Sequence, residues 1–282
     1  MEILHNRKTL VDYVERNKEM GKKIGFAPTM GALHEGHLSL YKKARENNDL
    51  VISSIFVNPT QFNNQEDLLK YPRNVEKDIQ LLKSTGNVDA VYIPQVEDIY
   101  PNGATSKQYN FDGLENEMEG AARPGHFDGV GTVVEELFRQ VKPDNAYFGE
   151  KDFQQLAIIR KMVEKVGLTV RIHGVPIVRN QKGLALSSRN QRLSEERRNE
   201  ATVIHDTLLK VNTWISQFTI SEIKEKVEEI FDELPGYKIE YFLIADEKTL
   251  KETDKIEKGK NYRSFIVVSV DNVRLIDNMQ IA

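Results

Sequence analysis

Strand-like and helix-like stretches alternate through about the first 175 residues, and this alternation limits the possible folds more than any other feature. Residues 50–57 (LVISSIFV) form a nearly continuous, β-branched apolar run, which is typical of a strand buried on both faces. Strands that alternate with helices predict βαβ units, a parallel sheet and right-handed crossovers. The expected strands are 23–27, 50–57, 90–93, 145–148 and 169–175; the expected helices are 9–20, 37–47, 75–83, 131–141 and the stretch that carries Leu156, Ile159, Val163 and Val166.

The pattern changes after Pro176. Ser194, followed by two glutamates, is a suitable N-cap for a long helix, and residues 220–234 are amphipathic. Strand-like runs follow at 239–244, 264–270 and 273–276, and Asp271-Asn272 suits a two-residue hairpin turn. We therefore expect an α/β protein with a Rossmann-like parallel-sheet domain at 1–176 and a smaller α+β domain at 177–282.

The composition excludes several classes of protein. With 43 acidic and 39 basic residues the formal charge is −4, so the chain lacks the basic field of nonspecific nucleic-acid binding. Cysteine is absent, which excludes disulfides, thiolate metal sites and cysteine nucleophiles. No run approaches the roughly 18 apolar residues of a membrane span, and the N-terminus does not resemble a signal peptide. We expect a soluble cytoplasmic enzyme or binding protein.

The segment 28–37 (PTMGALHEGH) lies between an expected strand and the next helix. Ligands bind at such junctions in open α/β sheets, where helix N-termini favour anions. Gly31 and Gly36 permit close approach of the backbone, while His34 and His37 supply donors, so the segment suits a phosphate cradle. The alternative is an ordinary surface turn. A zinc-protease motif would need histidine at Leu38, and neither a P-loop nor a Rossmann glycine motif is present.

Polar residues follow two further strands. Asn58 and Gln61 lie in 56–62 (FVNPTQF), where amides can recognise hydroxyls and carboxylates, although ordinary turn polarity is an equal alternative. In 148–155 (FGEKDFQQ), Lys151 can contact phosphate and Gln155 can face the same site. Asp152 can accept a hydrogen bond from a ribose hydroxyl, or it can simply cap the helix.

Three other features are less specific. Ser187, Ser188 and Arg189 form a small anion-binding set near the domain junction, or a plain loop before Ser194. The glycine-rich segment 123–131 suits a mobile loop or a helix N-terminus, and a structural role is favoured. Asp78 can touch a magnesium ion, but a solvated helix position is the favoured interpretation.

The four motifs, in this order and spacing, resemble those of the pantothenate synthetase (pantoate–β-alanine ligase) family. The first is similar to the His-x-Gly-His signature of the nucleotidylyltransferase superfamily, and 187–189 is similar to its second, lysine-containing loop. The lysines of that loop are missing here, so Arg189 with Lys151 would supply the charge.

The resemblance implies that the carboxylate of (R)-pantoate attacks the α-phosphorus of ATP and that β-alanine then attacks the enzyme-bound pantoyl adenylate. Pantothenate, AMP and pyrophosphate are the products. It implies catalytic roles for His37, His34, Lys151 and Arg189, with charge stabilisation ranked above proton transfer. Pantoate or β-alanine would meet Gln61 and Gln155, together with Asn58. The implied ATP-binding residues are Met30, Gly31, Ala32, Leu33, His34, Glu35, Gly36, His37, Gly149, Glu150, Lys151, Asp152, Val178, Leu186, Ser187, Ser188 and Arg189.

The resemblance also implies Mg²⁺ with the ATP, few protein ligands to the metal, no tightly bound organic cofactor and a homodimer in the cytoplasm. The second domain, carrying 187–189, would act as a lid that excludes water from the adenylate. Three alternatives remain: a nucleotidylyltransferase with another acceptor, a nonenzymatic nucleotide-binding regulator, and a metal-dependent hydrolase, for which the ligand spacing is poor.

Overall fold

A computed structural model describes residues 1–63 and 65–281. The chain divides into two compact units, each with its own sheet. Met1–Glu150 and Gln154–Pro176 form the first, which we call the sheet unit. Lys151–Phe153 and Ile177–Ala282 form the second, the C-terminal unit. Each unit is described separately below.

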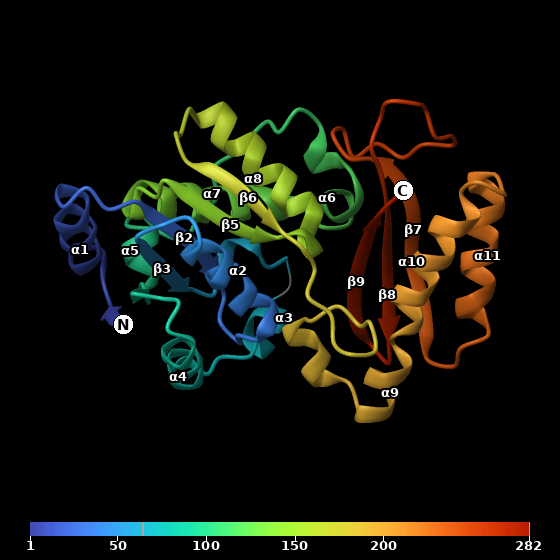
Figure 1. The fold of residues 1–282 in the computed structure, drawn as a ribbon, viewed down its shortest axis with the longest axis horizontal. Helices are drawn as coiled ribbons and strands as arrows, with labels where there is room; N and C mark the ends of the chain where they lie inside the picture. Colours follow the sequence, from blue (N-terminus) through green and yellow to red (C-terminus); the bar gives the residue numbers. More distant parts are fainter. Residues whose placement is uncertain (64, 282) are drawn as a thin grey trace. The chain divides into compact units, whose positions relative to one another are not determined.

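The sheet unit is built on six parallel strands in the order β1-β4-β3-β2-β5-β6. Four of them, β2, β3, β5 and β6, are labelled in Figure 1. The expected α/β fold class is therefore confirmed. The strands are β1 (Glu2–Leu4), β2 (Ile24–Thr29), β3 (Leu50–Ile55), β4 (Ala90–Tyr92), β5 (Asn145–Gly149) and β6 (Arg171–Val175). Strand β1 was not among the expected strands, because three residues are too few to produce a recognisable pattern.

Helices cover both faces of this sheet. Successive residues of β2 point to opposite faces: Ala27 belongs to an apolar cluster with Leu40 and Tyr41 of α2, whereas the ring of Phe26 meets Phe138 of α7 edge-on at 6.2 Å. This two-sided burial explains the continuous apolar run of β3. The helices are α1 (Arg7–Glu19), α2 (Glu35–Arg45), α3 (Gln65–Lys70), α4 (Val75–Thr85), α5 (Val96–Ile99), α6 (Met118–Ala122), α7 (His126–Val141) and α8 (Phe153–Val166), with 3₁₀ turns η1 (Pro59–Gln61), η2 (Leu114–Asn116) and η3 (Glu150–Asp152).

The strand order reverses between β2 and β5. From β2 the chain continues to β3 on one side, and it later returns as β5 on the other side of β2. In open α/β sheets, ligands bind at such a switch point, beyond the carboxyl ends of the strands. The loops that follow β2, β3 and β5 contain three of the four motifs identified in the sequence.

Helix α7 begins five residues earlier than the sequence indicates, at His126 rather than at residue 131. The glycine-rich segment is therefore largely helical, and the expectation of a structural role holds, whereas that of a mobile loop was wrong. Its glycines serve close packing. A Cβ on Gly129 would lie 2.5 Å from the carbonyl oxygen of Thr60, and one on Gly131 would lie 3.1 Å from the ring of Tyr109.

The C-terminal unit packs helices against an antiparallel sheet of order β7-β8-β9. Its core joins Ile204 and Leu208 of one helix, Phe231 of another, and Ile266 and Val268 of the central strand. Its elements are β7 (Tyr237–Asp246), β8 (Tyr262–Val270), β9 (Val273–Gln280), α9 (Glu195–Glu200), α10 (Val203–Trp214), α11 (Ile220–Asp232) and the 3₁₀ turn η4 (Ser188–Arg192).

Two local expectations in this unit have different outcomes. The hairpin turn is confirmed: Asp271 (φ 45°) and Asn272 (φ 68°) both have positive φ, as a type I′ turn requires. The single long helix after Ser194 was wrong. Ser194 does cap a helix, since its Oγ accepts a hydrogen bond from the Arg197 N–H at 3.1 Å, but this helix ends at Glu200 and α10 starts at Val203. Ala201, fully buried between them, anchors the break in the core.

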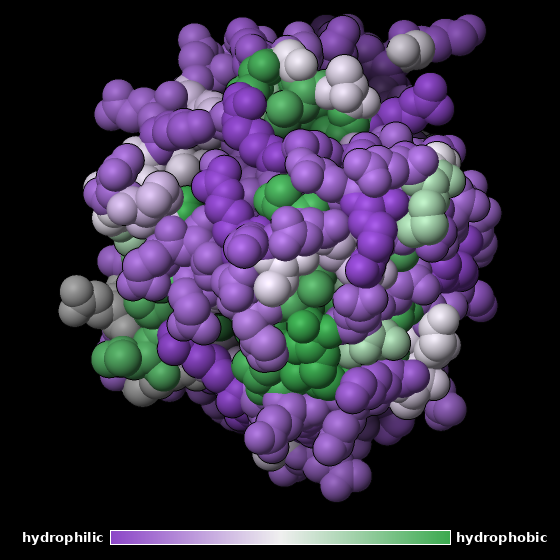
Figure 2. All heavy atoms as spheres, turned by 90° about the vertical axis from the view of Figure 1, so that its left-hand side faces the viewer, coloured by the Kyte–Doolittle hydropathy of each residue, from purple (hydrophilic) through white to green (hydrophobic). Residues whose placement is uncertain are grey.

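On the face that Figure 2 shows, hydrophilic side chains predominate, and apolar ones gather only in small separate areas. Across residues 1–63 and 65–281, no helix is both long enough and apolar enough to cross a membrane.

The two glycines of α7 provide a test of this packing. We expect Gly129→Ala to lower the free energy of unfolding by about 1–3 kcal/mol, because the new methyl group would push against backbone. Gly131→Ala should cost less, since the Tyr109 ring can move. Urea denaturation followed by circular dichroism measures the free energy of unfolding of both variants. Equal stability of the two would contradict the closer packing of Gly129 against backbone.

Candidate active site

His34 and His37 form the cap of α2, the helix that follows β2. The Nδ1 atom of His34 accepts a hydrogen bond from the Gly36 N–H at 3.1 Å, and that of His37 accepts one from the His34 N–H at 3.3 Å. This reciprocal pattern is a capping box, with histidines in the places that serine and glutamate often take. Because both Nδ1 atoms are acceptors, the proton of each neutral ring lies on Nε2. The N-terminus of α2 is itself a favourable place for an anion.

The loop that links β2 to this cap turns through two left-handed residues, Gly31 (φ 86°) and Ala32 (φ 51°). Asp78 of α4 holds it. Its carboxylate accepts hydrogen bonds from the Ala32 N–H at 2.9 Å and the Leu33 N–H at 2.8 Å. Asp78 is only 3% exposed, so the expectation of a solvated helix position was wrong. The helical period alone could not reveal this partner, which lies 46 residues away in the chain.

Asn58 is the N-cap of η1 and Gln61 is its last residue, in the segment that follows β3. The Asn58 side-chain N–H₂ donates to Gln61 Oε1 at 3.1 Å and to the Gly129 carbonyl at 3.1 Å. Its oxygen accepts from the Tyr100 hydroxyl at 2.6 Å, and burial raises the pKa of Tyr100, which keeps that hydroxyl a donor. Asn58 is 1% exposed, and both its side-chain oxygen and its N–H₂ group form hydrogen bonds to protein. The Gln61 Nε2 reaches the sulfur of Met30 at 3.0 Å, so the loops after β2 and β3 touch.

Arg123 and His126, at the start of α7, fix the backbone of Gln61. The Arg123 guanidinium donates to the Gln61 carbonyl at 3.2 Å, and His126 Nδ1 lies 2.9 Å from the same oxygen. The sequence singled out this segment but assigned it no link to Gln61. The sequence does show a basic residue and a histidine beside the start of a helix. Their partner, however, is a main-chain oxygen, which cannot be predicted from the pattern of side chains.

Adjacent glutamines of α8 have different roles. Gln154 is 5% exposed; its oxygen accepts from the Glu119 N–H, and its amide donates to the carbonyls of Leu114 and Glu117. Gln155 is only half-buried, and its side chain has no hydrogen-bond partner among the described residues. Gln154 therefore locks the preceding segment to α8, whereas the Gln155 amide is available to a ligand.

The fourth motif lies in the C-terminal unit, where a short ladder brings Val178 beside Leu186. The Leu186 N–H donates to the Val178 carbonyl at 2.9 Å, and Arg179 pairs with Ala185. A bidentate ion pair from Arg179 to Asp277 of β9 anchors the ladder, with distances of 2.5 and 2.9 Å.

The chain then turns into η4. Ser187 caps this 3₁₀ turn through an Oγ contact of 3.3 Å from the Arg189 N–H. Val178, Leu186, Ser187, Ser188 and Arg189 are all partly exposed. The structure thus gathers this expected group in one place.

Residues Lys151–Phe153 also pack within the C-terminal unit. Asn278 donates to the Lys151 carbonyl at 2.9 Å, and the Arg263 guanidinium stacks over the Phe153 ring, 4.1 Å from its centroid. The Lys151 side chain is 16% exposed, and its Nζ lies 3.9 Å from Asp152. These contacts hold the backbone of Lys151 within the C-terminal unit.

Metal ligands are sparse. Within residues 1–63 and 65–281 there is no group of three histidine, aspartate or glutamate side chains that could hold a metal ion. Both carboxylate oxygens of Asp78 already accept backbone N–H groups.

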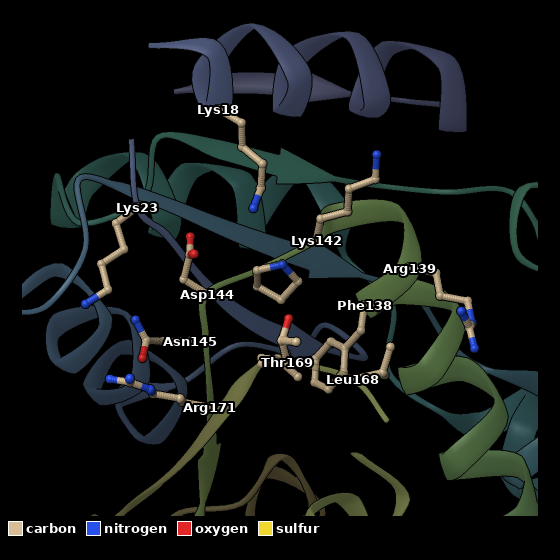
Figure 3. A pocket seen from close by; sticks show the side chains of 12 residues that line it. Lys18, Lys23, Phe138, Arg139, Lys142, Asp144, Asn145, Leu168, Thr169 and Arg171 are labelled. Atoms are coloured by element: carbon tan, nitrogen blue, oxygen red, sulfur yellow. The ribbon is translucent and has the colours of Figure 1, made fainter. Parts of the chain in front are cut away.

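A cavity of about 670 Å³ lies near the amino ends of β2, β5 and β6, at the edge opposite the motifs. Figure 3 shows the side chains that line it. Its lining includes the cationic side chains of Lys18, Lys23, Arg139, Lys142 and Arg171. Lys18 and Arg139 occupy last turns of α1 and α7, and Lys142 is the C-cap of α7. Cations at these positions complement the negative ends of helix dipoles, which themselves disfavour anions. Because the cavity lies at the amino ends of the strands, away from the loops that carry the motifs, it is not the candidate active site.

Comparison with known proteins shows the family of the chain. The family model of pantoate–β-alanine ligase matches residues 2–280. A pantothenate synthetase of Christiangramia forsetii is 50% identical over 279 residues, covering 99% of both chains. One of Bacteroides fragilis is 47% identical over 280 residues, again covering 99% of both chains.

Solved structures of the same family resemble the whole chain. Pantothenate synthetase from Thermus thermophilus superposes with a TM-score of 0.91 at 41% identity, covering 100% of this chain and 99% of that one. Pantoate–β-alanine ligase from Francisella tularensis, complexed with β,γ-ATP and β-alanine, gives 0.81 at 38% identity, covering 99% of this chain and 97% of that one. On these matches, which span nearly the whole chain, the protein belongs to the pantoate–β-alanine ligase family, whose members are enzymes that form an amide bond.

Proposed function

We propose that this ligase joins (R)-pantoate to β-alanine in two half-steps. The pantoate carboxylate attacks the α-phosphorus of ATP and expels pyrophosphate, giving pantoyl adenylate. The amine of β-alanine then attacks the acyl carbon of this intermediate and AMP leaves, giving pantothenate. Family membership over residues 2–280 is the observation that carries the proposal. The relative from Francisella tularensis, which holds β,γ-ATP and β-alanine, supports ATP and β-alanine as substrates here.

The first half-step brings two anions together, so positioning and charge stabilisation are the main requirements. Holding both reactants in place can contribute on the order of 7–11 kcal/mol. The N-terminus of α2 and the Nε2–H donors of His34 and His37 would face the phosphates and stabilise the charge that builds up as pyrophosphate leaves. The capping geometry supports this role, because a ring whose Nδ1 already accepts a hydrogen bond presents its other nitrogen as a donor. No proton transfer by these rings is needed.

For pantoate we assign Gln61 and Gln155. Gln155 offers an unpartnered amide within the described chain, and Gln61 lies on the loop that meets Met30. Asn58 was expected to contact substrate directly. Its full set of protein hydrogen bonds supports an indirect role instead, in which it orients Gln61.

For ATP we assign the loop and helix start from Met30 to His37, the segment Gly149–Asp152, and the group Val178 and Leu186–Arg189. Lys151 and Arg189 would supply the positive charge that the missing lysines of the second superfamily loop would otherwise provide.

Magnesium would arrive with the ATP phosphates and keep several of its waters. We further propose a homodimer in the cytoplasm, without a tightly bound organic cofactor, on the basis of the family resemblance.

The decisive experiment is isotope exchange between ATP and labelled pyrophosphate. Because the adenylate forms before the amine attacks, exchange should require pantoate and proceed without β-alanine. Mass spectrometry of the complete reaction should then detect pantothenate and AMP. Exchange without pantoate, or a stable adenylate as final product, would instead favour a nucleotidylyltransferase with another acceptor.

The histidines can be tested without disturbing the helix cap. His34→Asn retains a capping acceptor and His37→Gln retains a side chain that can reach the cap N–H, but both lack the imidazole Nε2–H. We expect each to slow adenylation by about 10²–10³, as for loss of one transition-state donor. The alanine variants should lose at least as much, and the exposed His5→Ala should behave as wild type. Wild-type rates in the asparagine and glutamine variants would show that these histidines only cap α2.

The glutamines give a second test. Gln61→Ala and Gln155→Ala should raise the KM for pantoate while ATP binding is kept, because each would remove an amide that holds the acid. Gln154→Ala is the matched control: it strips partners from three backbone groups, so it should lower stability. Steady-state kinetics with thermal melts separates the two effects. An equal loss of ATP and pantoate binding in Gln61→Ala would contradict its assignment.

A further inference from the structure

We propose that Asp78 is a positioning residue for adenylation: its carboxylate holds the backbone of residues 31–33 in the shape that the ATP site requires. This inference rests on the proposed function, since it assumes that the loop after β2 binds ATP. Asp78 would act through the loop and would not itself touch substrate.

The first support is the geometry of the carboxylate. Asp78 Oδ2 accepts the Ala32 N–H at 2.9 Å and Oδ1 accepts the Leu33 N–H at 2.8 Å, with the side chain 3% exposed. Hydrogen bonds to an ionised acceptor are stronger than neutral ones, and burial strengthens them further. Two successive backbone donors thus converge on one buried side chain, and each oxygen takes one of them.

The second support is the shape of the loop. Gly31 and Ala32 both adopt the left-handed region, which a non-glycine residue such as Ala32 occupies only when its surroundings impose it. A Cβ on Gly31 would lie 2.9 Å from Asp78 Oδ2 and 3.2 Å from Ile55 Cγ2. The loop therefore lies directly against the carboxylate, with no space for a side chain between them.

The third support is what the loop carries. At its start, Met30 contacts the Gln61 amide; at its end, His34 caps α2. A shift of residues 31–33 would therefore move the proposed pantoate-binding group and the proposed phosphate-binding histidines together.

The identity of the side chain matters. A carboxylate has two acceptor oxygens, whereas the isosteric asparagine has one oxygen and an N–H₂ group that would face a backbone donor. Asp78→Asn should therefore release the N–H of Ala32 or Leu33 while preserving the volume of the side chain.

The experiment measures kinetics and hydrogen exchange on the full-length Asp78→Asn protein. A misplacement of catalytic groups of about 1 Å can cost about 10²-fold, so we expect kcat/KM for ATP in pantoate-dependent pyrophosphate exchange to fall by at least 10-fold. The fall should include kcat as well as KM. By mass spectrometry, the backbone amides of the peptide that contains Ala32 and Leu33 should exchange hydrogen for deuterium faster than in wild type.

Asp98→Asn is the matched control. Asp98 in α5 also accepts two backbone N–H groups, from Arg7 and Gln95, each at 2.9 Å, but it bonds no described residue of the loop after β2. This variant should lose local protection around residues 7 and 95 while its ATP kinetics stay at the wild-type value. A purely structural role of Asp78 would make the two variants kinetically alike.

Wild-type kcat and KM in a folded Asp78→Asn protein, or unchanged exchange at residues 32 and 33, would overturn the inference. If Asp78→Asn does not fold, Gly31→Ala decides, since its methyl group must displace the carboxylate while the buried charge is retained; wild-type kinetics there would also overturn it. Absence of pantoate-dependent exchange in the wild type would refute the proposed reaction instead. The deuterium measurement does not depend on activity, so the two failures are distinguishable.

Discussion

Parallel pairing of β2 with β3 on one side and β5 on the other is the constraint on which the rest of the sheet unit depends. Parallel strands end at the same edge, so the loops that follow these three strands must emerge together. The polar residues after β2 and after β3, separated by a whole βα unit in the chain, meet in this way: Gln61 touches Met30. The relative positions of these loops then depend on the contacts that hold them.

The loops are held by polar groups that would have little stabilising value in water but are buried here. Asp78 binds the turn after β2, Asn58 and Tyr100 fix the side chain of Gln61, and Arg123 with His126 fixes its carbonyl. A buried polar group without a partner is costly, so each such bond selects one loop conformation among many. Rigid placement is what a reaction between two anions requires, because the catalytic gain comes mainly from orientation and preset donors.

Much of this organisation was predictable. The α/β class was predicted from the alternation of strand-like and helix-like stretches. The two-residue hairpin turn was predicted from Asp271-Asn272. The family was predicted from motifs that occur in the expected order along the chain. The errors are informative. Helix α7 begins at His126, five residues before the expected start, and its glycines Gly129 and Gly131 lie close to Thr60 and Tyr109. The helical stretch after Ser194 is divided into α9 and α10, and Ala201, which lies between them, is fully buried.

The sequence by itself determined the types of element, the strands buried on both faces, the residues at the strand ends and the family, because these depend on local period and on motifs that are contiguous in the chain. Only the tertiary structure decided which polar side chains are available to ligands and which support others. Gln154 and Gln155 are neighbours of identical chemistry, yet one bonds three backbone groups and the other none among the described residues. Asp78 was expected on a solvated helix face, but α4 brings it against a loop 46 residues away. Such roles depend on partners that are distant in the sequence, and local sequence patterns do not show which distant residues come into contact.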